Sequence, residues 1–88
     1  MTRIIIATLL SLGLATSVSA DANVTLEQLP EPVRQTVLRE VKTGQVTDLE
    51  RDDRKDGSVV YEIEFVFEKV EYELDVAPDG KVLKKVVD

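Results

Sequence analysis

Residues 61–76 have the sequence YEIEFVFEKVEYELDV, in which apolar and acidic residues alternate almost without a break. This alternation is typical of β-strands that bury one face and leave the other in water. Residues 59–76 contain no Gly or Pro, yet strands usually hold only about 5–6 residues and seldom more than ten. We therefore expect the chain to reverse direction inside this segment.

The position of the reversal follows from the parity of the apolar residues. A two-residue loop at Glu68 and Lys69 pairs two strands so that their large apolar side chains share one face, namely Tyr61, Ile63, Phe65, Phe67, Val70, Tyr72, Leu74 and Val76. A four-residue loop keeps the same parity, whereas a three-residue loop needs a bulge to restore it. Because Glu-Lys lacks the Asn-Gly chemistry that tight hairpin turns prefer, the type of turn is left open.

Residues 25–44 precede the strands and predict a short turn followed by an amphipathic helix. Thr25 can cap the first turn, and Gln28 has the spacing of a capping box. Pro30 interrupts this turn, and Gly44 is a natural end for the helix. Between them, apolar residues recur at helical spacing and form one stripe, made up of Val33, Val37, Leu38 and Val41. Such a helix needs a surface on which to bury its stripe.

Further strands flank the central segment. Residues 45–53 form a weak strand, and the odd spacing of Val46 and Leu49 predicts a bulge or a bend in it. The dipeptide DG at positions 56–57 is a strong hairpin signal, and APDG at positions 77–80 forms another turn. The predicted fold class is therefore α+β, with the N-terminal helix packed on one face of a four-stranded antiparallel β-meander.

The last strand, residues 81–88, can turn either of its faces toward the helix. With a three-residue loop at positions 78–80, the side chains that face the helix are those of Val82, Lys84 and Val86. A two-residue loop instead turns inward Leu83, Lys85 and Val87. The sequence leaves both registers open.

The first twenty residues have the layout of a secretory signal peptide. Arg3 is followed by an apolar run at positions 4–14, and VSA ends the segment with small residues suited to cleavage after Ala20. An uncleaved membrane anchor is the alternative, but it needs about 20 apolar residues. We expect a periplasmic or secreted protein without membrane attachment after cleavage, with residues 21–25 as a flexible lead and residues 26–88 as one domain.

Composition excludes several classes of function. Without Arg3, ten basic residues face 17 acidic ones, which gives a net charge of −7. This charge opposes binding to nucleic acid, whose phosphates attract Lys and Arg, and favours basic partners. Cys and His are absent, so the chain has no thiol nucleophile and no imidazole base. We therefore predict that it is not an enzyme and has no catalytic residues and no cofactor.

A metal site is also not predicted. Residues 52–63 resemble a calcium-binding loop in part, but Arg54 occupies a ligand position and Ile63 stands where the bidentate Glu is needed. Transition metals prefer His or Cys ligands, and neither occurs.

The polar side of the two central strands is the candidate site. In the predicted register Glu64 lies opposite Glu73, and like charges directly across a strand pair destabilise a sheet by about 0.2–1 kcal/mol each. Neighbouring strands are expected to neutralise part of this repulsion through Arg51, Lys81, Lys84 and Lys85. The face is either simply solvated or a docking surface for a basic protein, with Val60 and Val66 as apolar contacts. Its candidate partner-binding residues are Glu62, Glu64, Val66, Glu71, Glu73 and Asp75.

Several of these motifs together resemble the PepSY and PepSY-like domains of exported bacterial proteins. They are LPEPVRQTV at the start of the helix, the DG hairpin, and then YEIEF, YELDV and PDGKVLK. The resemblance runs from about Leu26 to Asp88 and rests on structural rather than chemical motifs. It implies a helix-on-sheet module that binds other proteins, similar in fold to the repeats of a β-lactamase inhibitory protein. The segment FEKVEY departs from the Asp-Gly or Asn-Gly common at the middle hairpin of this family.

We therefore expect an exported protein-binding module, and the resemblance implies inhibition or modulation of a secreted or periplasmic peptidase. One alternative is a sensory accessory protein whose acidic face binds a cation or a small cationic ligand. Another is a structural protein of the envelope. The identity of the partner and the oligomeric state are not set by the sequence.

Overall fold

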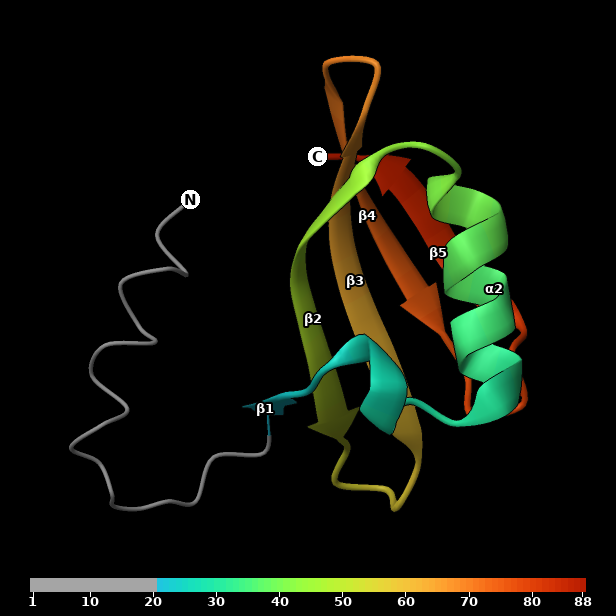
Figure 1. Cartoon of the computed structure of the whole chain (residues 1–88). Coiled ribbons are helices and arrows are strands. Elements are labelled where there is room, and N and C mark those ends of the chain that lie inside the picture. The colour runs from blue at the N-terminus through green and yellow to red at the C-terminus, as the bar shows by residue number, and fades with distance from the viewer. Residues whose placement is uncertain (1–20) are drawn as a thin grey trace, which may run out of the picture.

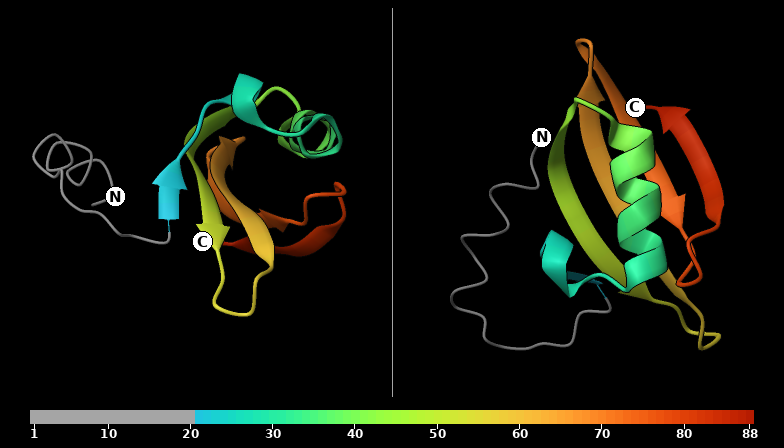
Figure 2. Two further views of the ribbon diagram at one scale, coloured as in Figure 1. Left: turned by 90° about the horizontal axis from the view of Figure 1, so that it is seen from below. Right: turned by 45° about the vertical axis from the view of Figure 1, so that its right-hand side comes forward.

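The computed structural model describes residues 21–88 (Figure 1), and the expected signal peptide over residues 1–20 lies outside the described residues. All strands pair antiparallel in the order β1-β2-β3-β4-β5. The helix α2 lies on one side of this sheet (Figure 2). The elements are β1 (Asp21–Asn23), the 3-10 turn η1 (Leu26–Gln28), α2 (Glu31–Val41), β2 (Gln45–Asp53), β3 (Val59–Phe67), β4 (Val70–Val76) and β5 (Val82–Val87). The prediction of an α+β fold with a helix on an antiparallel meander is confirmed.

The hairpin of β3 and β4 has the register that the parity of its apolar residues predicts. Phe67 pairs with Val70, and the pairing continues without a shift to Tyr61 and Val76. The two-residue loop between the strands places Glu68 at φ 52° and Lys69 at φ 69°. Positive φ at both central positions is the signature of a type I′ turn, whose twist matches that of the flanking strands. The hairpin therefore forms a tight turn from two residues that do not favour its backbone conformation.

The core lies between α2 and the inner side of β3 and β4. Phe65 and Tyr72, neighbours across these two strands, stack with ring centroids 5.1 Å apart. Burying one such apolar side chain contributes roughly 1.5–3 kcal/mol, so burial alone can stabilise a chain without disulfides. The buried core side chains are Leu29, Val33, Val37, Val41, Leu49, Tyr61, Ile63, Phe65, Leu74 and Val76.

Leu38 does not join this core, contrary to the prediction from the helical stripe. The reason is that α2 is held at the β5 side of the sheet. The Thr36 hydroxyl donates a hydrogen bond to the Gly80 carbonyl at 2.6 Å, and Lys85 Nζ lies 2.9 Å from Glu40 Oε1. Leu38 lies on the opposite flank of the helix, because residues two apart differ by about 200° around the axis. It is 54% exposed.

The strand β2 contains the irregularity that its sequence predicts. Its pairing with β3 shifts between Val46 and Asp48, which leaves Thr47 as an extra residue. This bulge brings both Val46 and Leu49 to the helix side of the sheet, opposite Phe65 and Ile63.

The N-terminal lead contributes a short strand to the sheet. Asp21–Asn23 forms the short strand β1 along one end of β2, with Asp21 opposite Asp52 and Asn23 opposite Glu50. Sequence alone gives no sign of this pairing, because it depends on the open edge of β2 that the rest of the fold provides. The chain then enters η1, where the Thr25 N–H donates to Gln28 Oε1 at 2.8 Å.

The last strand combines both registers that the sequence left open. Its pairing with β4 shifts by one residue at Leu83, so Val82 lies opposite Val76 while Lys85 lies opposite Leu74. The side facing the helix therefore carries Val82, Lys85 and Val87. The Lys85 ammonium lies 5.5 Å from the ring centroid of Tyr72, and ring faces attract cations. This contact and the ion pair with α2 explain why a lysine is tolerated on that side.

Gly44 joins α2 to β2 at a point where a side chain has no room. A Cβ atom at this position would lie 2.3 Å from the Val66 carbonyl oxygen and 3.2 Å from the Phe67 Cα. Both contacts are with backbone atoms of β3, which cannot move away as a flexible side chain could. Glycine therefore lets the end of the helix approach the sheet closely.

No helix within residues 21–88 is long and apolar enough to cross a membrane.

Replacing Glu68 and Lys69 by Asn-Gly is expected to stabilise the protein by about 1 kcal/mol, because Asn and Gly adopt positive φ at little cost. Urea unfolding followed by circular dichroism measures this change. The control variant Glu68→Asn/Lys69→Ala keeps a Cβ at the second position and should gain less. Equal stability of all three proteins would show that the turn is not strained.

Candidate docking face

The side of the sheet opposite α2 collects eight acidic side chains from three neighbouring strands. Strand alternation places there three carboxylates from β2, two from β3 and three from β4, at positions set by the register of the sheet. We call this surface the acidic face. Its carboxylates belong to Asp48, Glu50, Asp52, Glu62, Glu64, Glu71, Glu73 and Asp75.

Six of these carboxylates form two rows that run directly across the three strands. One row contains Glu50, Glu62 and Asp75, and the other contains Asp48, Glu64 and Glu73. Side chains directly opposite have Cβ atoms about 4.5–5.5 Å apart, and like charges at that distance destabilise the sheet. The register therefore places like charges next to one another on this face.

All six residues predicted for the site lie together on this face. The carboxylates of β2 were not predicted for the site, because the bulge at Thr47 interrupts the alternation of this strand. The signal was present as acids at every second position after Thr47, namely Asp48, Glu50 and Asp52.

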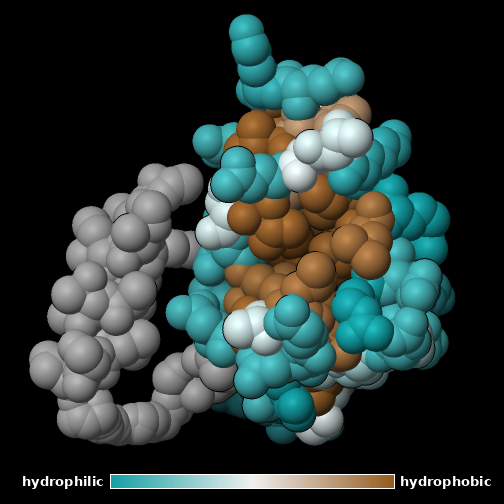
Figure 3. All heavy atoms as spheres, viewed as in Figure 1, coloured by the Kyte–Doolittle hydropathy of each residue, from teal (hydrophilic) through white to brown (hydrophobic). Residues whose placement is uncertain are grey.

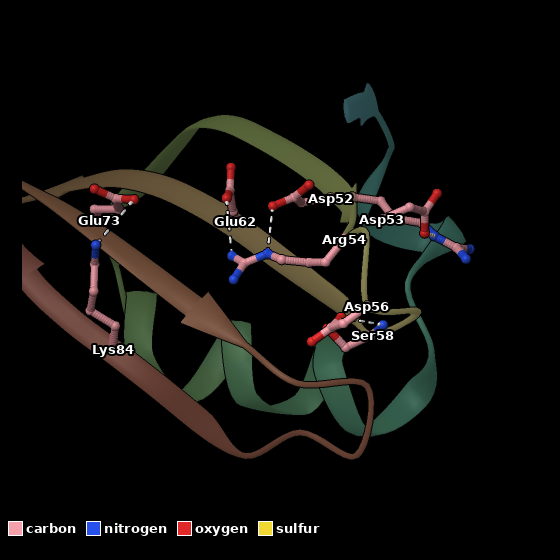
Figure 4. A network of polar contacts seen from close by, with 9 residues as sticks. Asp52, Asp53, Arg54, Asp56, Ser58, Glu62, Glu73 and Lys84 are labelled. Atoms are coloured by element: carbon pink, nitrogen blue, oxygen red, sulfur yellow. Dashed lines mark hydrogen bonds and ion pairs between the residues drawn. The ribbon is translucent and has the colours of Figure 1, made fainter. Parts of the chain in front are cut away.

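Arg54 brings a positive charge to the acidic face. Its Nε lies 2.8 Å from Asp52 Oδ2, and a terminal nitrogen lies 3.7 Å from Glu62 Oε2. The hydrogen bond to Asp52 raises the pKa of Arg54 above its usual value. Figure 4 shows this side chain reaching from the loop after β2 across to β3, while Lys84 of β5 points toward Glu73. Lys84 Nζ lies 3.9 Å from Glu73 Oε2.

Two of the residues expected to neutralise this face lie elsewhere. Arg51 lies opposite Tyr61, on the helix side of the sheet, and pairs with Asp53 at 2.9 Å. Lys85 also lies on the helix side, where it pairs with Glu40. Within residues 21–88, the acidic face therefore carries eight carboxylates beside Arg54 and Lys84.

The acidic face has a buried centre. Asp75 is 9% exposed, and its Oδ1 atom is buried without a hydrogen-bond partner within residues 21–88. Val60, predicted to be an apolar contact for a partner, is only 6% exposed. Val66 is partly buried, so it remains accessible at the other end of the face. A buried acceptor without a donor costs roughly 1–3 kcal/mol.

Asp56 has a structural role in the turn between β2 and β3. Its Oδ1 atom accepts hydrogen bonds from the Ser58 hydroxyl at 2.6 Å and from the Ser58 backbone N–H at 2.9 Å. These bonds hold the pKa of Asp56 below its usual range.

Within residues 21–88, no group of three or more potential ligands is arranged to hold a metal ion.

Neither a protein-family model nor a curated protein sequence matches this chain. The resemblance to PepSY domains therefore stays a prediction from the motifs themselves. The acidic face is a candidate site on the basis of its geometry alone.

Replacing Arg54 by Ala is expected to lower the midpoint of urea unfolding more than replacing Arg51 by Ala. Arg54 offsets charge on two neighbouring strands, whereas Arg51 pairs with a carboxylate on its own strand. The difference should shrink at high salt, because the Debye length falls to about 3 Å at 1 M. Equal losses at low salt would mean that Arg54 does not relieve the repulsion on this face.

Proposed function

We propose that this protein is an exported protein-binding module whose acidic face docks a basic surface of its partner. The observation that carries this proposal is the pair of carboxylate rows, in register across β2, β3 and β4. An antiparallel sheet can leave one face in water without any charge clustering. A face on which carboxylates lie in register is complementary to a partner surface that carries Lys or Arg.

The same arrangement favours fast and selective association. A surface with one dominant sign of charge attracts oppositely charged partners over distance and raises the rate of encounter. Val66 offers partly exposed apolar surface beside the carboxylates.

The more specific form of the proposal is a PepSY-like protein that inhibits or modulates a secreted or periplasmic peptidase. It is supported by the motif resemblance and by the signal-peptide pattern of residues 1–20. We propose no enzymatic activity for the chain itself. The absence of His and Cys from the sequence supports that view.

A second candidate function is the binding of a small cationic ligand. The buried, unpartnered oxygen of Asp75 favours it, because a compact ammonium group or a cation could satisfy that acceptor. Titration with spermidine or calcium, followed by backbone amide NMR shifts, tests this candidate. Shifts centred on Asp75 and its neighbours would support it, and an unchanged spectrum would rule it out.

Reversing two charges of the acidic face tests the protein-docking proposal. The Glu64→Lys/Glu73→Lys variant should reduce capture of basic proteins from an envelope extract by about tenfold or more, because each lost charge contact contributes about 1 kcal/mol or more. Quantitative mass spectrometry of the captured proteins measures this loss.

The matched control is Glu27→Lys/Glu68→Lys, which changes the net charge equally at exposed positions away from the acidic face. This control should capture the same proteins as the unmodified chain, and thermal unfolding should show that both variants are folded. Unchanged capture by the Glu64→Lys/Glu73→Lys variant would remove the acidic face from the proposed function.

A further inference from the structure

The outer edge of β2 is only partly covered. β1 pairs with the end of β2 at Glu50, Arg51 and Asp52, and the Val24 N–H donates to the Leu49 carbonyl at 3.1 Å. The chain then turns away into η1. Among residues 21–88, no strand lies along the outer edge of β2 at positions 45–47. A strand edge of this kind offers backbone groups with which another chain can pair.

An apolar groove opens beside this edge, on the helix side of the sheet. It holds roughly 350 Å³, within the range of small ligand and peptide-side-chain pockets. Figure 3 shows apolar surface in the middle of this view, bordered by polar residues on both sides. Leu38 adds exposed apolar surface on the flank of α2 away from β5. The residues that line the groove are Asn23, Val24, Thr25, Leu26, Val46, Thr47, Asp48 and Leu49.

We propose that the edge of β2 and this groove bind a short extended segment of another protein, in which apolar and basic residues alternate. The segment adds to the sheet as a strand beside β2, a mode in which backbone hydrogen bonds give affinity and side-chain pockets give selectivity. Side chains of an added strand point alternately to the two sides of the sheet. On the helix side they enter the groove formed by Val24, Leu26, Val46 and Leu49.

The charge of the other side defines the remaining positions of the segment. At the open positions 45–47 an added strand lies beside Gln45, whose row continues through Val66 and Glu71, and one end of the strand comes next to Asp48. A side chain of the segment on that side, near Asp48, is therefore favoured as Lys or Arg and disfavoured as Asp or Glu. The bulge at Thr47 interrupts regular pairing, so the bound segment is short.

A second copy of this chain fits the edge poorly. Its other open strand, β5, carries Lys84 on one side and Lys85 on the opposite side. Pairing of β5 with the edge of β2 would direct one of these ammonium groups into the apolar groove. The large negative charge of both copies opposes the same contact. A segment from a different protein is therefore the occupant that the structure favours.

This inference differs from the docking proposal, because the segment binds through the backbone edge of β2 and the groove on the helix side, and only its basic side chains lie beside the acidic face. The probe is the blocked peptide acetyl-KVKVKVK-amide, added to the ¹⁵N-labelled protein. We expect amide shifts and slowed hydrogen exchange at Gln45, Val46 and Thr47. The acidic analogue acetyl-EVEVEVE-amide should not bind.

N-methylated peptides distinguish strand addition from simple charge attraction. One peptide carries the methyl groups on its valines and the other on its lysines, so each loses a different set of backbone donors. An added strand pairs through alternate residues, so one peptide should bind about tenfold more weakly while the other keeps its affinity. Equal binding of the two N-methylated peptides, or amide shifts confined to the acidic face, would contradict strand addition at β2. Either result would leave the docking proposal unaffected.

A pair of matched variants tests the groove itself. Val46→Ser should weaken binding of the lysine–valine peptide, whereas Val86→Ser, on the opposite edge strand, should leave it unchanged. Thermal unfolding of both variants verifies that they are folded. Equal affinity of the two variants, or self-association of the free protein that the peptide does not reverse, would contradict the proposed occupant.

Discussion

The two-residue turn at Glu68 and Lys69 is the constraint on which the rest of this structure depends. It sets the register of β3 and β4, and a shift of one residue would move every side chain of one strand to the other face. In the observed register Phe65 stacks on Tyr72 beneath α2, while Glu64 lies opposite Glu73 on the other side. The apolar core and the acidic face are therefore two consequences of the same pairing. The turn has to adopt positive φ at two ordinary residues, and the burial of the core offsets that strain.

The helix is held against this hairpin by close contacts at both of its ends. At one end Gly44 approaches the backbone of β3, and at the other end the turn at Gly80 passes so close to Pro32 that a Cβ atom would lie 2.7 Å from its carbonyl oxygen. Thr36 adds a hydrogen bond to the same turn. These contacts place α2 toward β5 and leave the β2 side less covered. The apolar groove beside β2 is a direct result of this asymmetry, as is the exposure of Leu38.

Much of the fold could be predicted from residue patterns, because alternation and helical spacing report directly on burial. The helix, the hidden turn, the bulge in β2 and the six predicted residues of the acidic face all follow from such local patterns. The pairing of β1 and the register of β5 could not be predicted. The pairing of β1 depends on a strand edge that residues distant in the sequence create. The register of β5 depends on a bulge at Leu83, and the sequence around Leu83 contains no Gly, Pro or irregular spacing that would predict a bulge. The same limit applies to Arg51 and Arg54, whose positions on opposite faces depend on where β2 ends.

The backbone contact between Glu64 and Glu73 tests the central claim most directly. With a two-residue turn, Phe67 and Val70 close the hairpin as a hydrogen-bonded pair, and alternation makes Glu64 and Glu73 a non-hydrogen-bonded pair with Cα atoms about 4.5 Å apart. Nuclear Overhauser measurements on the labelled protein should therefore give a strong cross-strand contact between the Hα atoms of Glu64 and Glu73. A contact from Glu64 to Tyr72 or to Leu74 in its place would contradict the register, and with it both the core and the acidic face.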